Sequence, residues 1–198
     1  MIAGVVLAAG LSRRMGRAKL LLSIEGRPVI RIAVEGVLAA SLTPVVVVTG
    51  AEHRELEQAL AGLPVTLVNN PSPEAGQASS MRIGINALPH DAEAVVIALG
   101  DQPFVPPIVI DGLLGARRAT SAAIVAPRYR DGRGNPVLFG REIFPELLEV
   151  SGDEGARSVI ARDSARVTLV DFEFPMPQDV DTPEDYARLR PAEKPGVN

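Results

Sequence analysis

Residues 5–19 read VVLAAGLSRRMGRAK, an apolar run that is followed by small residues and then by a cluster of positive charges. The apolar start is typical of a buried β-strand, and the small residues at positions 8–10 let a ligand approach the backbone closely. Backbone N–H groups in such a loop can bind phosphate. The cations that follow are Arg13, Arg14, Arg17 and Lys19. The stretch therefore predicts a strand that ends in a phosphate-binding loop; the alternative is a solvated basic loop without a ligand.

Apolar, β-branched runs alternate with helical patterns along the rest of the chain. Several of the predicted strands are apolar at nearly every position, as in strands that helices cover on both faces. We therefore expect an α/β fold with three layers, in which a mostly parallel central sheet lies between helices. One domain is expected over residues 1–190, and the Pro- and Gly-containing residues 191–198 are expected to form a flexible tail. Strands are predicted at 2–8, 44–49, 64–68, 94–99, 122–126, 136–139 and 166–170, and helices at 28–40, 52–61, 77–87, 106–118, 141–149, 154–162 and 182–190.

Composition argues against several classes of function. The chain has 198 residues, no cysteine and a net charge of −4. Without cysteine there is no disulfide, thiolate metal site or thiol nucleophile, and an acidic chain does not favour sequence-independent binding of nucleic acid. No apolar stretch is long enough to span a bilayer and no leader pattern is visible, so we expect a cytoplasmic protein without a membrane partner. His53 and His90 fall in a polar helix and a loop, where we expect surface positions.

Asp101 directly follows the predicted strand at 94–99 and its Gly100 turn. Ligands of open α/β sheets bind beyond the carboxyl ends of the strands, where a carboxylate can hold a hard cation such as Mg²⁺. The alternative is that Asp101 begins a turn or caps the helix near residue 106.

A second acidic segment, QDVDTPEDY, occupies residues 178–186. If it is extended, Asp179 and Asp181 share one face. Either Thr182 or Asp181 can cap the helix that follows, with Asp185 near the capping-box position. We expect Asp181 to be a second metal ligand that coexists with this cap.

Three other polar segments are candidates for substrate contacts. In EAGQASSMRIGI, residues 74–85, two serines open a helix, and helix capping accounts for only one of them, so Gly76, Ser79 and Ser80 are candidate ligand contacts. The segments at 132–139 and 151–157 are either plain turns and caps or sites of contact with a substrate. We assign Gln102, Asn135 and Arg157 to that substrate.

Five motifs taken together resemble a known family. LAAGLSRRMGRAKLLL, GDQPFV, GNPVLF, GDEGAR and DVDTPEDY occur in this order over residues 7–186. They are similar to the motifs of the MobA-like nucleotidyltransferases, and most closely to those of the molybdenum cofactor cytidylyltransferases. The resemblance covers about residues 2–190 and implies a three-layer, Rossmann-like nucleotidyltransferase fold. One departure is Asn135, since many relatives carry histidine at that position and asparagine cannot become cationic.

The resemblance implies a reaction and a set of roles. CMP would pass from CTP to the terminal phosphate of a molybdopterin-type molybdenum cofactor, and pyrophosphate would leave, with Mg²⁺ as the cofactor. CTP and the molybdopterin-type cofactor would be the substrates, and a transient contact with a molybdoenzyme or its chaperone is left open. Asp101 and Asp181 would hold the metal, and Arg14, Lys19 and Asp101 would be catalytic. Nucleotide binding is assigned to Leu7, Ala8, Ala9, Gly10, Ser12, Arg13 and Lys19, together with the residues at 76–80 named above.

Two alternatives stay open. One is a related nucleotidyltransferase whose acceptor is a sugar phosphate or methylerythritol phosphate, because the phosphate-binding motifs would look alike. The other is a nucleotide-binding protein that delivers cofactor to a partner without turnover, although pure binding would not require Asp101. Ala9 bears on the choice of base: GTP-using relatives tend to carry glycine there, so the methyl group predicts a preference for CTP over GTP.

Overall fold

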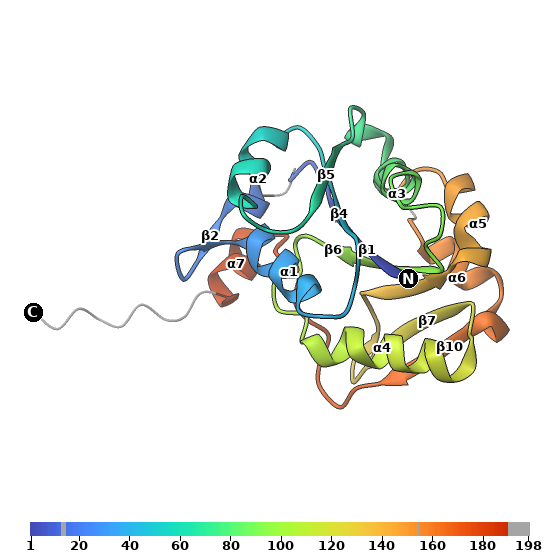
Figure 1. The fold of residues 1–198 in the computed structure, drawn as a ribbon. Helices are drawn as coiled ribbons and strands as arrows, with labels where there is room; N and C mark the ends of the chain where they lie inside the picture. The colour runs from blue at the N-terminus through green and yellow to red at the C-terminus, as the bar shows by residue number, and fades with distance from the viewer. Residues whose placement is uncertain (13–14, 154, 190–198) are drawn as a thin grey trace, which may run out of the picture.

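Strand β1 (Ile2–Ala8) lies inside the central sheet of the computed structural model, which describes residues 1–12, 15–153 and 155–189 (Figure 1). It pairs in parallel with β4 (Val45–Thr49) on one side and with β6 (Ala94–Leu99) on the other. Beyond β4, strand β5 (Thr66–Asn69) continues the parallel arrangement. The carboxyl ends of these four strands therefore meet at one edge of the sheet.

The other half of the sheet changes direction. Strand β9 (Val137–Gly140) runs antiparallel to both β6 and β7 (Ile124–Tyr129). The edge strand β10 (Val167–Asp171) is parallel to β7, and the short β8 (Gly132–Arg133) pairs with β7 in the antiparallel sense. The expected mostly parallel sheet is confirmed. The reversal at β9 was not predicted, because an apolar run carries no information about the direction of its strand.

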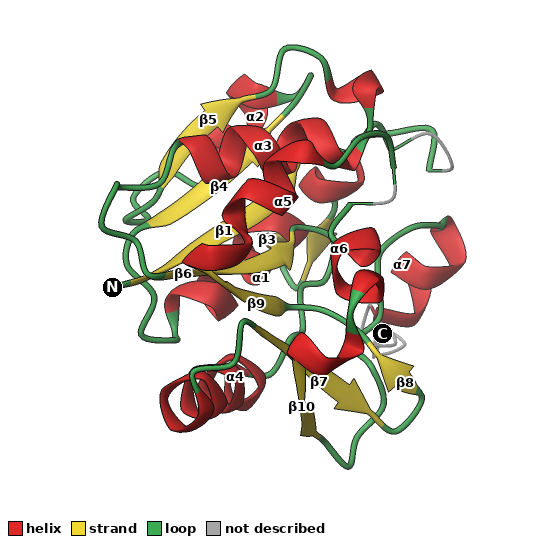
Figure 2. Ribbon diagram, turned by 90° about the vertical axis from the view of Figure 1, so that its right-hand side faces the viewer, coloured by secondary structure: helices red, strands yellow, loops and turns green. Residues whose placement is uncertain are grey.

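Helices cover both faces of the sheet and form the expected outer layers (Figures 1 and 2). One face packs against α1 (Val29–Leu38), α2 (His53–Ala59) and α4 (Pro107–Thr120). The opposite face packs against α3 (Gln77–Asn86), α5 (Phe144–Glu149) and α6 (Arg157–Arg162).

Neighbouring residues of the central strands alternate between these two hydrophobic cores. Val6 and Val47 belong to the core with α1, while Val5 and Val46 belong to the core with α3. All four side chains are at most 1% exposed. Each buried valine contributes about 1.5–3 kcal/mol to folding, which is why these runs are apolar at every position rather than at every second one.

The regular elements agree with the predicted ranges to within a few residues, and α7 (Pro183–Leu189) ends the described chain. The short elements were not predicted. They are the hairpin of β2 (Ser23–Ile24) and β3 (Arg27–Pro28), the strand β8, and the 3₁₀ turns η1 (Lys19–Leu21), η2 (Pro73–Ala75) and η4 (Ser164–Arg166). The 3₁₀ turn η3 (Arg141–Ile143) forms the start of the helix predicted at 141–149. Two- and three-residue elements are too short to produce a hydrophobic period.

The path of the chain around β1 determines where a ligand site can form. The chain builds the sheet first on one side of β1 and then on the other. From β1 it leaves over the face that carries α1 to reach β4, and from β5 it returns over the face that carries α3 to reach β6. Such a reversal opens a crevice at the carboxyl ends of the two strands between which it occurs. Here these strands are β1 and β6.

Within the described residues, no helix is both long and apolar enough to cross a membrane. The predicted tail at 191–198 lies outside the described residues.

Candidate active site

A cavity of about 380 Å³ lies at the carboxyl ends of β1 and β6. Its walls come from the end of β1 with the loop after it, the segment from η2 into α3, the acidic turns after β6 and before α7, and the loop before α6. The residues that line it are Leu7, Ala8, Ala9, Gly10, Leu11, Ser12, Lys19, Leu20, Pro73, Glu74, Gly76, Gln77, Ser80, Leu99, Asp101, Asp153 and Asp181. Ten of the predicted site residues are therefore brought together in one cavity.

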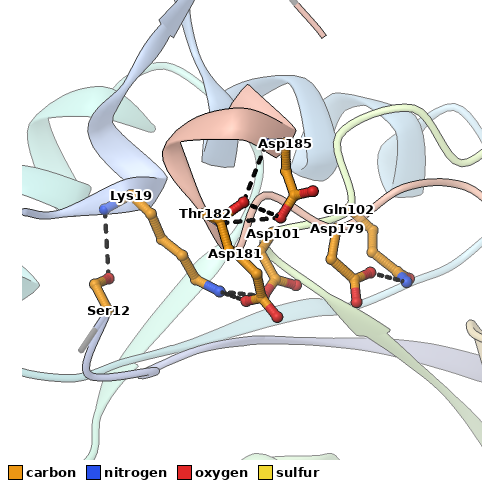
Figure 3. Close-up of polar contacts among 8 residues, drawn as sticks. All are labelled: Ser12, Lys19, Asp101, Gln102, Asp179, Asp181, Thr182 and Asp185. Carbon is orange, nitrogen blue, oxygen red and sulfur yellow. Dashed lines mark hydrogen bonds and ion pairs between the residues drawn. The ribbon is translucent and has the colours of Figure 1, made fainter. Parts of the chain in front are cut away.

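The loop after β1 turns back at Ser12 so that Lys19 reaches the cavity. Ser12 has a φ of 48° and its carbonyl oxygen accepts hydrogen bonds from the N–H groups of Met15 and Gly16. Its hydroxyl accepts a hydrogen bond from the backbone N–H of Lys19 at 3.3 Å (Figure 3). The predicted residues Arg13 and Arg14 lie outside the described residues. Arg17 points elsewhere, with its guanidinium 5.7 Å from the centre of the Tyr186 ring.

The ammonium group of Lys19 lies between two carboxylates (Figure 3). Nζ donates to Oδ2 of Asp101 at 2.6 Å and to Oδ1 of Asp181 at 2.7 Å. The Lys19 side chain is only 10% exposed, and the two carboxylates are 21% and 28% exposed. Burial alone would lower the pKa of Lys19, but the attraction and hydrogen bonds of Asp101 and Asp181 outweigh it and raise that pKa above its ordinary 10.5. Lys19 is therefore a fixed cation at the cavity wall.

Two local features bring Asp101 and Asp181 together. Gly100 lets the chain after β6 pass close to its neighbours, since a Cβ atom there would lie 2.8 Å from the Ile30 side chain and 3.2 Å from the carbonyl oxygen of Leu7. The backbone N–H of Val180 then donates to the carbonyl oxygen of Asp101 at 2.9 Å, which ties the segment before α7 to the end of β6.

The capping box predicted at the start of α7 is present. The N–H of Asp185 donates to the hydroxyl of Thr182 at 3.2 Å, and the N–H of Thr182 donates to the carboxylate of Asp185 at 2.9 Å. Thr182 is thus the cap, and Asp181 is left to face Lys19. Asp101 does not cap α4, whose first turn follows Pro106.

Gln102 and Asp179 form a polar pair beside the group of Lys19, Asp101 and Asp181 (Figure 3). Gln102 is only 2% exposed, and its Nε2 donates to Oδ1 of Asp179 at 2.5 Å. The surrounding protein desolvates the Asp179 carboxyl and raises its pKa, and the charges of Asp101 and Asp181 act in the same direction. Gln102 was assigned to the substrate from the sequence; in the structure it is buried against Asp179 and does not line the cavity.

The carboxylates suit a small, hard cation. Mg²⁺ takes oxygen ligands and is usually held by one or two carboxylates together with substrate phosphates, rather than by an all-protein cage. Asp101 and Asp181 supply such a pair. No group of three or more His, Cys, Asp or Glu side chains with metal-binding geometry occurs among the described residues, so a cation here would complete its coordination with phosphate oxygens and water.

The wall formed by η2 and α3 depends on contact with the loop before α6. Gly76 has a φ of +90°, and a Cβ atom there would lie 2.5 Å from the backbone of Gly152. The N–H of Ala78 donates to the carbonyl oxygen of Gly152 at 3.1 Å. This docking carries Asp153 into the cavity. Sequence reasoning treated the 151–157 segment as a possible contact for the second substrate and missed its role beside α3.

The two predicted serines of α3 occupy different positions. Ser80 lines the cavity, whereas Ser79 does not. Neither caps the helix, because the N-cap residue is Gly76 and no side chain makes a capping hydrogen bond. Both hydroxyls accept hydrogen bonds from Nδ2 of the buried Asn70, at 2.8 and 2.9 Å. Asn70 was missed in the sequence, where it reads as a turn residue in a polar NNPSP stretch.

The remaining predicted residues lie away from this cavity. Asn135 is half-buried, and its carbonyl oxygen accepts a hydrogen bond from the Tyr129 hydroxyl at 2.6 Å. Arg157 is exposed at the start of α6. The surface position expected for His90 is confirmed, but that for His53 is wrong: His53 is half-buried, and its Nδ1 lies 2.6 Å from the Thr49 hydroxyl at the end of β4.

A family model that describes the MobA-like NTP transferase domain matches residues 4–167, which is most of the chain. The chain belongs to this family. Solved structures agree with the assignment. The crystal structure of Rv0371c from Mycobacterium tuberculosis has a TM-score of 0.85 and 30% identity over 95% of this chain and 96% of that one. A nucleotidyl transferase from Methanothermobacter has a TM-score of 0.80 and 28% identity over 96% of each chain.

Relatives of known name are similar over nearly their whole length. Nicotine blue oxidoreductase of Paenarthrobacter nicotinovorans is 32% identical, covering 95% of this chain and 96% of that protein. The purine catabolism protein PucB of Bacillus subtilis is 31% identical over 96% of each. A molybdenum cofactor guanylyltransferase of Rhodobacter capsulatus is 30% identical over 94% of each, and the molybdenum cofactor cytidylyltransferase of Escherichia coli is 23% identical over 92% of each. The family and the fold thus support a transferase, and the two molybdenum cofactor transferases among these relatives differ in the nucleotide that their names specify.

Proposed function

We propose that this protein transfers CMP from CTP to the terminal phosphate of a molybdopterin-type molybdenum cofactor and releases pyrophosphate. The observation that carries the proposal is the position of Lys19. Its ammonium group contacts both Asp101 and Asp181 at the wall of the cavity that follows β1. A cation and two carboxylates at the end of a small-residue loop are the parts that nucleotidyl transfer needs.

The cavity offers a place for each part of a nucleoside triphosphate. The loop of small residues at 8–10 lines it and allows phosphate oxygens to approach the backbone. Lys19 stands at the same end of the cavity and neutralises phosphate charge. The wall formed by residues 73–80 carries no cationic side chain, so the ribose and the base are placed there and the phosphates at the Lys19 end.

The chemical step is a displacement at the α-phosphorus of CTP. An oxygen of the acceptor's terminal phosphate forms the new bond to phosphorus, and the bond to the bridging oxygen of the β-phosphate breaks, with its electron pair leaving on pyrophosphate. A phosphate monoester is largely ionised at neutral pH, with a second pKa of about 6, so no general base is required. The protein's own contribution is to align the two substrates and to neutralise the charge on the departing group through Lys19.

Asp101 and Asp181 are the residues that would hold Mg²⁺. When bound, the ion would supply charge neutralisation on the phosphate oxygens as a Lewis acid. The proposal assigns Asp101 the larger share, because it directly follows β6 and its backbone is held by Val180. Arg14, which lies outside the described residues, is proposed from the sequence motif to assist Lys19.

A specific observation keeps a second function in view. A relative at 32% identity is called an oxidoreductase, and the chain is similar to nearly all of it. The stretch after β1 lacks the G-x-G-x-x-G pattern by which dinucleotides are commonly bound, and its cations favour a triphosphate. We therefore place nucleotidyl transfer first, and we include a reduced nicotinamide dinucleotide among the ligands to be tested.

A pyrophosphate-release assay tests the proposal. Purified protein with Mg²⁺ is given each of the four NTPs, with and without molybdopterin-type cofactor, and in parallel with a sugar phosphate or methylerythritol phosphate as acceptor. Release that requires both CTP and the molybdenum cofactor is expected. Preference for GTP would overturn the choice of nucleotide, and release with another acceptor would overturn the choice of substrate. Binding of CTP and cofactor without release would favour a delivery protein, and oxidation of NADH or NADPH without NTP dependence would favour the oxidoreductase.

A further inference from the structure

Asn70 is a buried polar residue that is hydrogen-bonded to Ser80 of the cavity wall. It follows β5, is 2% exposed, and uses every hydrogen-bonding group of its side chain. Its Oδ1 accepts from the backbone N–H of Ser72 at 2.9 Å. Its Nδ2 donates to the hydroxyl oxygens of Ser79 and Ser80. The residue thus connects the turn before η2 with the first turn of α3.

These contacts fix the orientation of the Asn70 amide. The backbone N–H of Ser72 can only donate, so the oxygen of the amide must face it. The two hydrogens of Nδ2 then face the two serines, one for each hydroxyl. Both hydroxyl oxygens are therefore acceptors toward Asn70, and each serine must direct its own hydrogen somewhere else.

The two serines differ in where that hydrogen can go. The hydroxyl of Ser79 lies 2.8 Å from the carbonyl oxygen of Gly76 and 3.3 Å from that of Ser72, so its hydrogen is used within the protein. The hydroxyl of Ser80 has no acceptor of its own among the described residues, and Ser80 is the serine that lines the cavity. Its O–H group is therefore left as a donor toward the cavity.

We propose that Asn70, whose amide oxygen is held by the backbone N–H of Ser72, is a positioning residue that orients the Ser80 hydroxyl as a hydrogen-bond donor to the nucleobase, whereas the Ser79 hydroxyl is bonded within the protein and does not contact the nucleotide. This inference rests on the proposed function only in requiring that the cavity bind a nucleoside triphosphate. Bases offer carbonyl oxygens and ring nitrogens as acceptors, and cytosine carries both on one edge. A buried donor that is already oriented loses little freedom on binding, which makes it an effective contact.

Calorimetric titration of the protein with CTP and Mg²⁺, without any acceptor, tests the inference apart from turnover. Ser80→Ala is expected to weaken CTP binding about three- to tenfold, the range for loss of one neutral hydrogen bond. Ser79→Ala is the matched control, since it removes a hydroxyl bonded to the same amide but off the cavity wall. It is expected to lower the melting temperature and to change the dissociation constant for CTP by less than about twofold.

Asn70→Asp tests the positioning role. A carboxylate cannot donate, so the Ser80 hydroxyl would turn its hydrogen toward residue 70 and away from the cavity. CTP binding is expected to weaken about as much as in Ser80→Ala, although the serine is still present. Adding Ser80→Ala to Asn70→Asp should then cost little more. These single and double variants form a double-mutant cycle. If thermal melts show that Asn70→Asp does not fold, Asn70→Ala takes its place in that cycle.

Each outcome decides a different point. A wild type that binds no CTP or other NTP would overturn the proposed function and this inference with it. Normal CTP binding that Ser80→Ala leaves unchanged, or that Ser79→Ala weakens equally, would overturn this inference alone. A Ser80→Ala effect that persists in full in the Asn70 variant would show that Asn70 does not orient the serine.

Discussion

The Nζ atom of Lys19 lies 2.6 Å from Oδ2 of Asp101, although 82 residues separate them in the chain. The same nitrogen lies 2.7 Å from Oδ1 of Asp181. The ammonium group therefore occupies the position between two carboxylates that a divalent cation would also favour. If Asp101 and Asp181 hold Mg²⁺ as proposed, Lys19 and the cation would compete for the same carboxylates when no nucleotide is bound.

Asp101→Ala is expected to abolish most of the turnover while leaving the fold intact. The Asp101 carboxylate is partly exposed and bonds to Lys19 rather than to the hydrophobic core. Loss of a metal-binding carboxylate removes several kcal/mol of charge stabilisation, which corresponds to about two to three orders of magnitude in kcat. Asp181→Ala should have a smaller effect. The measurement is kcat at saturating Mg²⁺, with Asp111→Ala on the exposed face of α4 as the control; an Asp101→Ala protein that keeps more than a modest fraction of wild-type kcat contradicts the assignment.

Lys19→Met is expected to affect the metal and the nucleotide in opposite directions. Removing the ammonium leaves the two carboxylates without a counter-charge, so Mn²⁺, used as a probe for Mg²⁺, should bind about tenfold more tightly in the absence of nucleotide. With CTP and acceptor present, kcat should fall more than KM for CTP rises, because the charge on the leaving group is no longer neutralised.

Titration of Mn²⁺ by paramagnetic resonance and steady-state kinetics check the two parts of this prediction. Arg118→Met removes an equal charge from the exposed end of α4 and should change neither quantity. Weaker Mn²⁺ binding in Lys19→Met would mean that lysine does not compete with the cation, and an effect confined to KM would assign Lys19 to binding of the ground state only.

The sequence predicted this pair of carboxylates because both follow simple local rules. Asp101 comes at the end of an apolar strand, and Asp181 precedes a recognisable helix cap. Long apolar runs report burial directly, so the three layers could also be predicted. Neither rule predicts that Lys19 contacts the two aspartates. The local sequence around Lys19 predicts a cation near phosphate and carries no information about its distant carboxylate partners.

Residues whose role depends on contacts between distant segments escaped prediction. Asn70 reads as one of several turn residues, and only the fold shows that its amide lies under two serines of α3. Asp153 reaches the cavity because the backbone of Gly152 packs directly against Gly76. This close contact requires glycine at position 76, which has a φ of +90° and no Cβ atom. Gln102 is buried although its motif suggests contact with substrate. Such arrangements belong to tertiary structure and leave no periodicity in the sequence.

Glu146→Gln is expected to lower stability in a manner that depends on pH. Glu146 on α5 accepts hydrogen bonds from Arg166 and from Arg162, the latter at 3.3 Å, and the hydrogen bond of Arg166 is the main reason that its pKa is lowered from the ordinary 4.5. A lowered pKa in the folded state means that the stabilisation is present above about pH 4.5 and is lost as the pH falls through the folded-state value. Solvent screens this pair, so less than about 1 kcal/mol is expected.

Thermal melts between pH 7 and pH 3 measure this difference. The melting temperature of Glu146→Gln should lie below that of the wild type at pH 7, and the two should converge under acid conditions. Glu57→Gln removes an exposed carboxylate from α2 and should show no such convergence. If the difference in melting temperature between wild type and Glu146→Gln stayed constant across the pH range, the ion pairs of Glu146 would contribute nothing to stability.

Ala9→Gly is expected to weaken a preference for CTP over GTP without inverting it. Ala9 lines the cavity and is 6% exposed, so its methyl group occupies space that a larger base would need. One methyl group is worth about 1–3 kcal/mol of discrimination at most. The measurement is kcat/KM for both nucleotides in both proteins, and Ala51→Gly, which removes a methyl group from an exposed turn outside the cavity, is the control. A wild type that prefers GTP would contradict the proposed nucleotide, whereas an unchanged ratio in Ala9→Gly would contradict only the role of the methyl group and leave discrimination to the wall formed by residues 73–80.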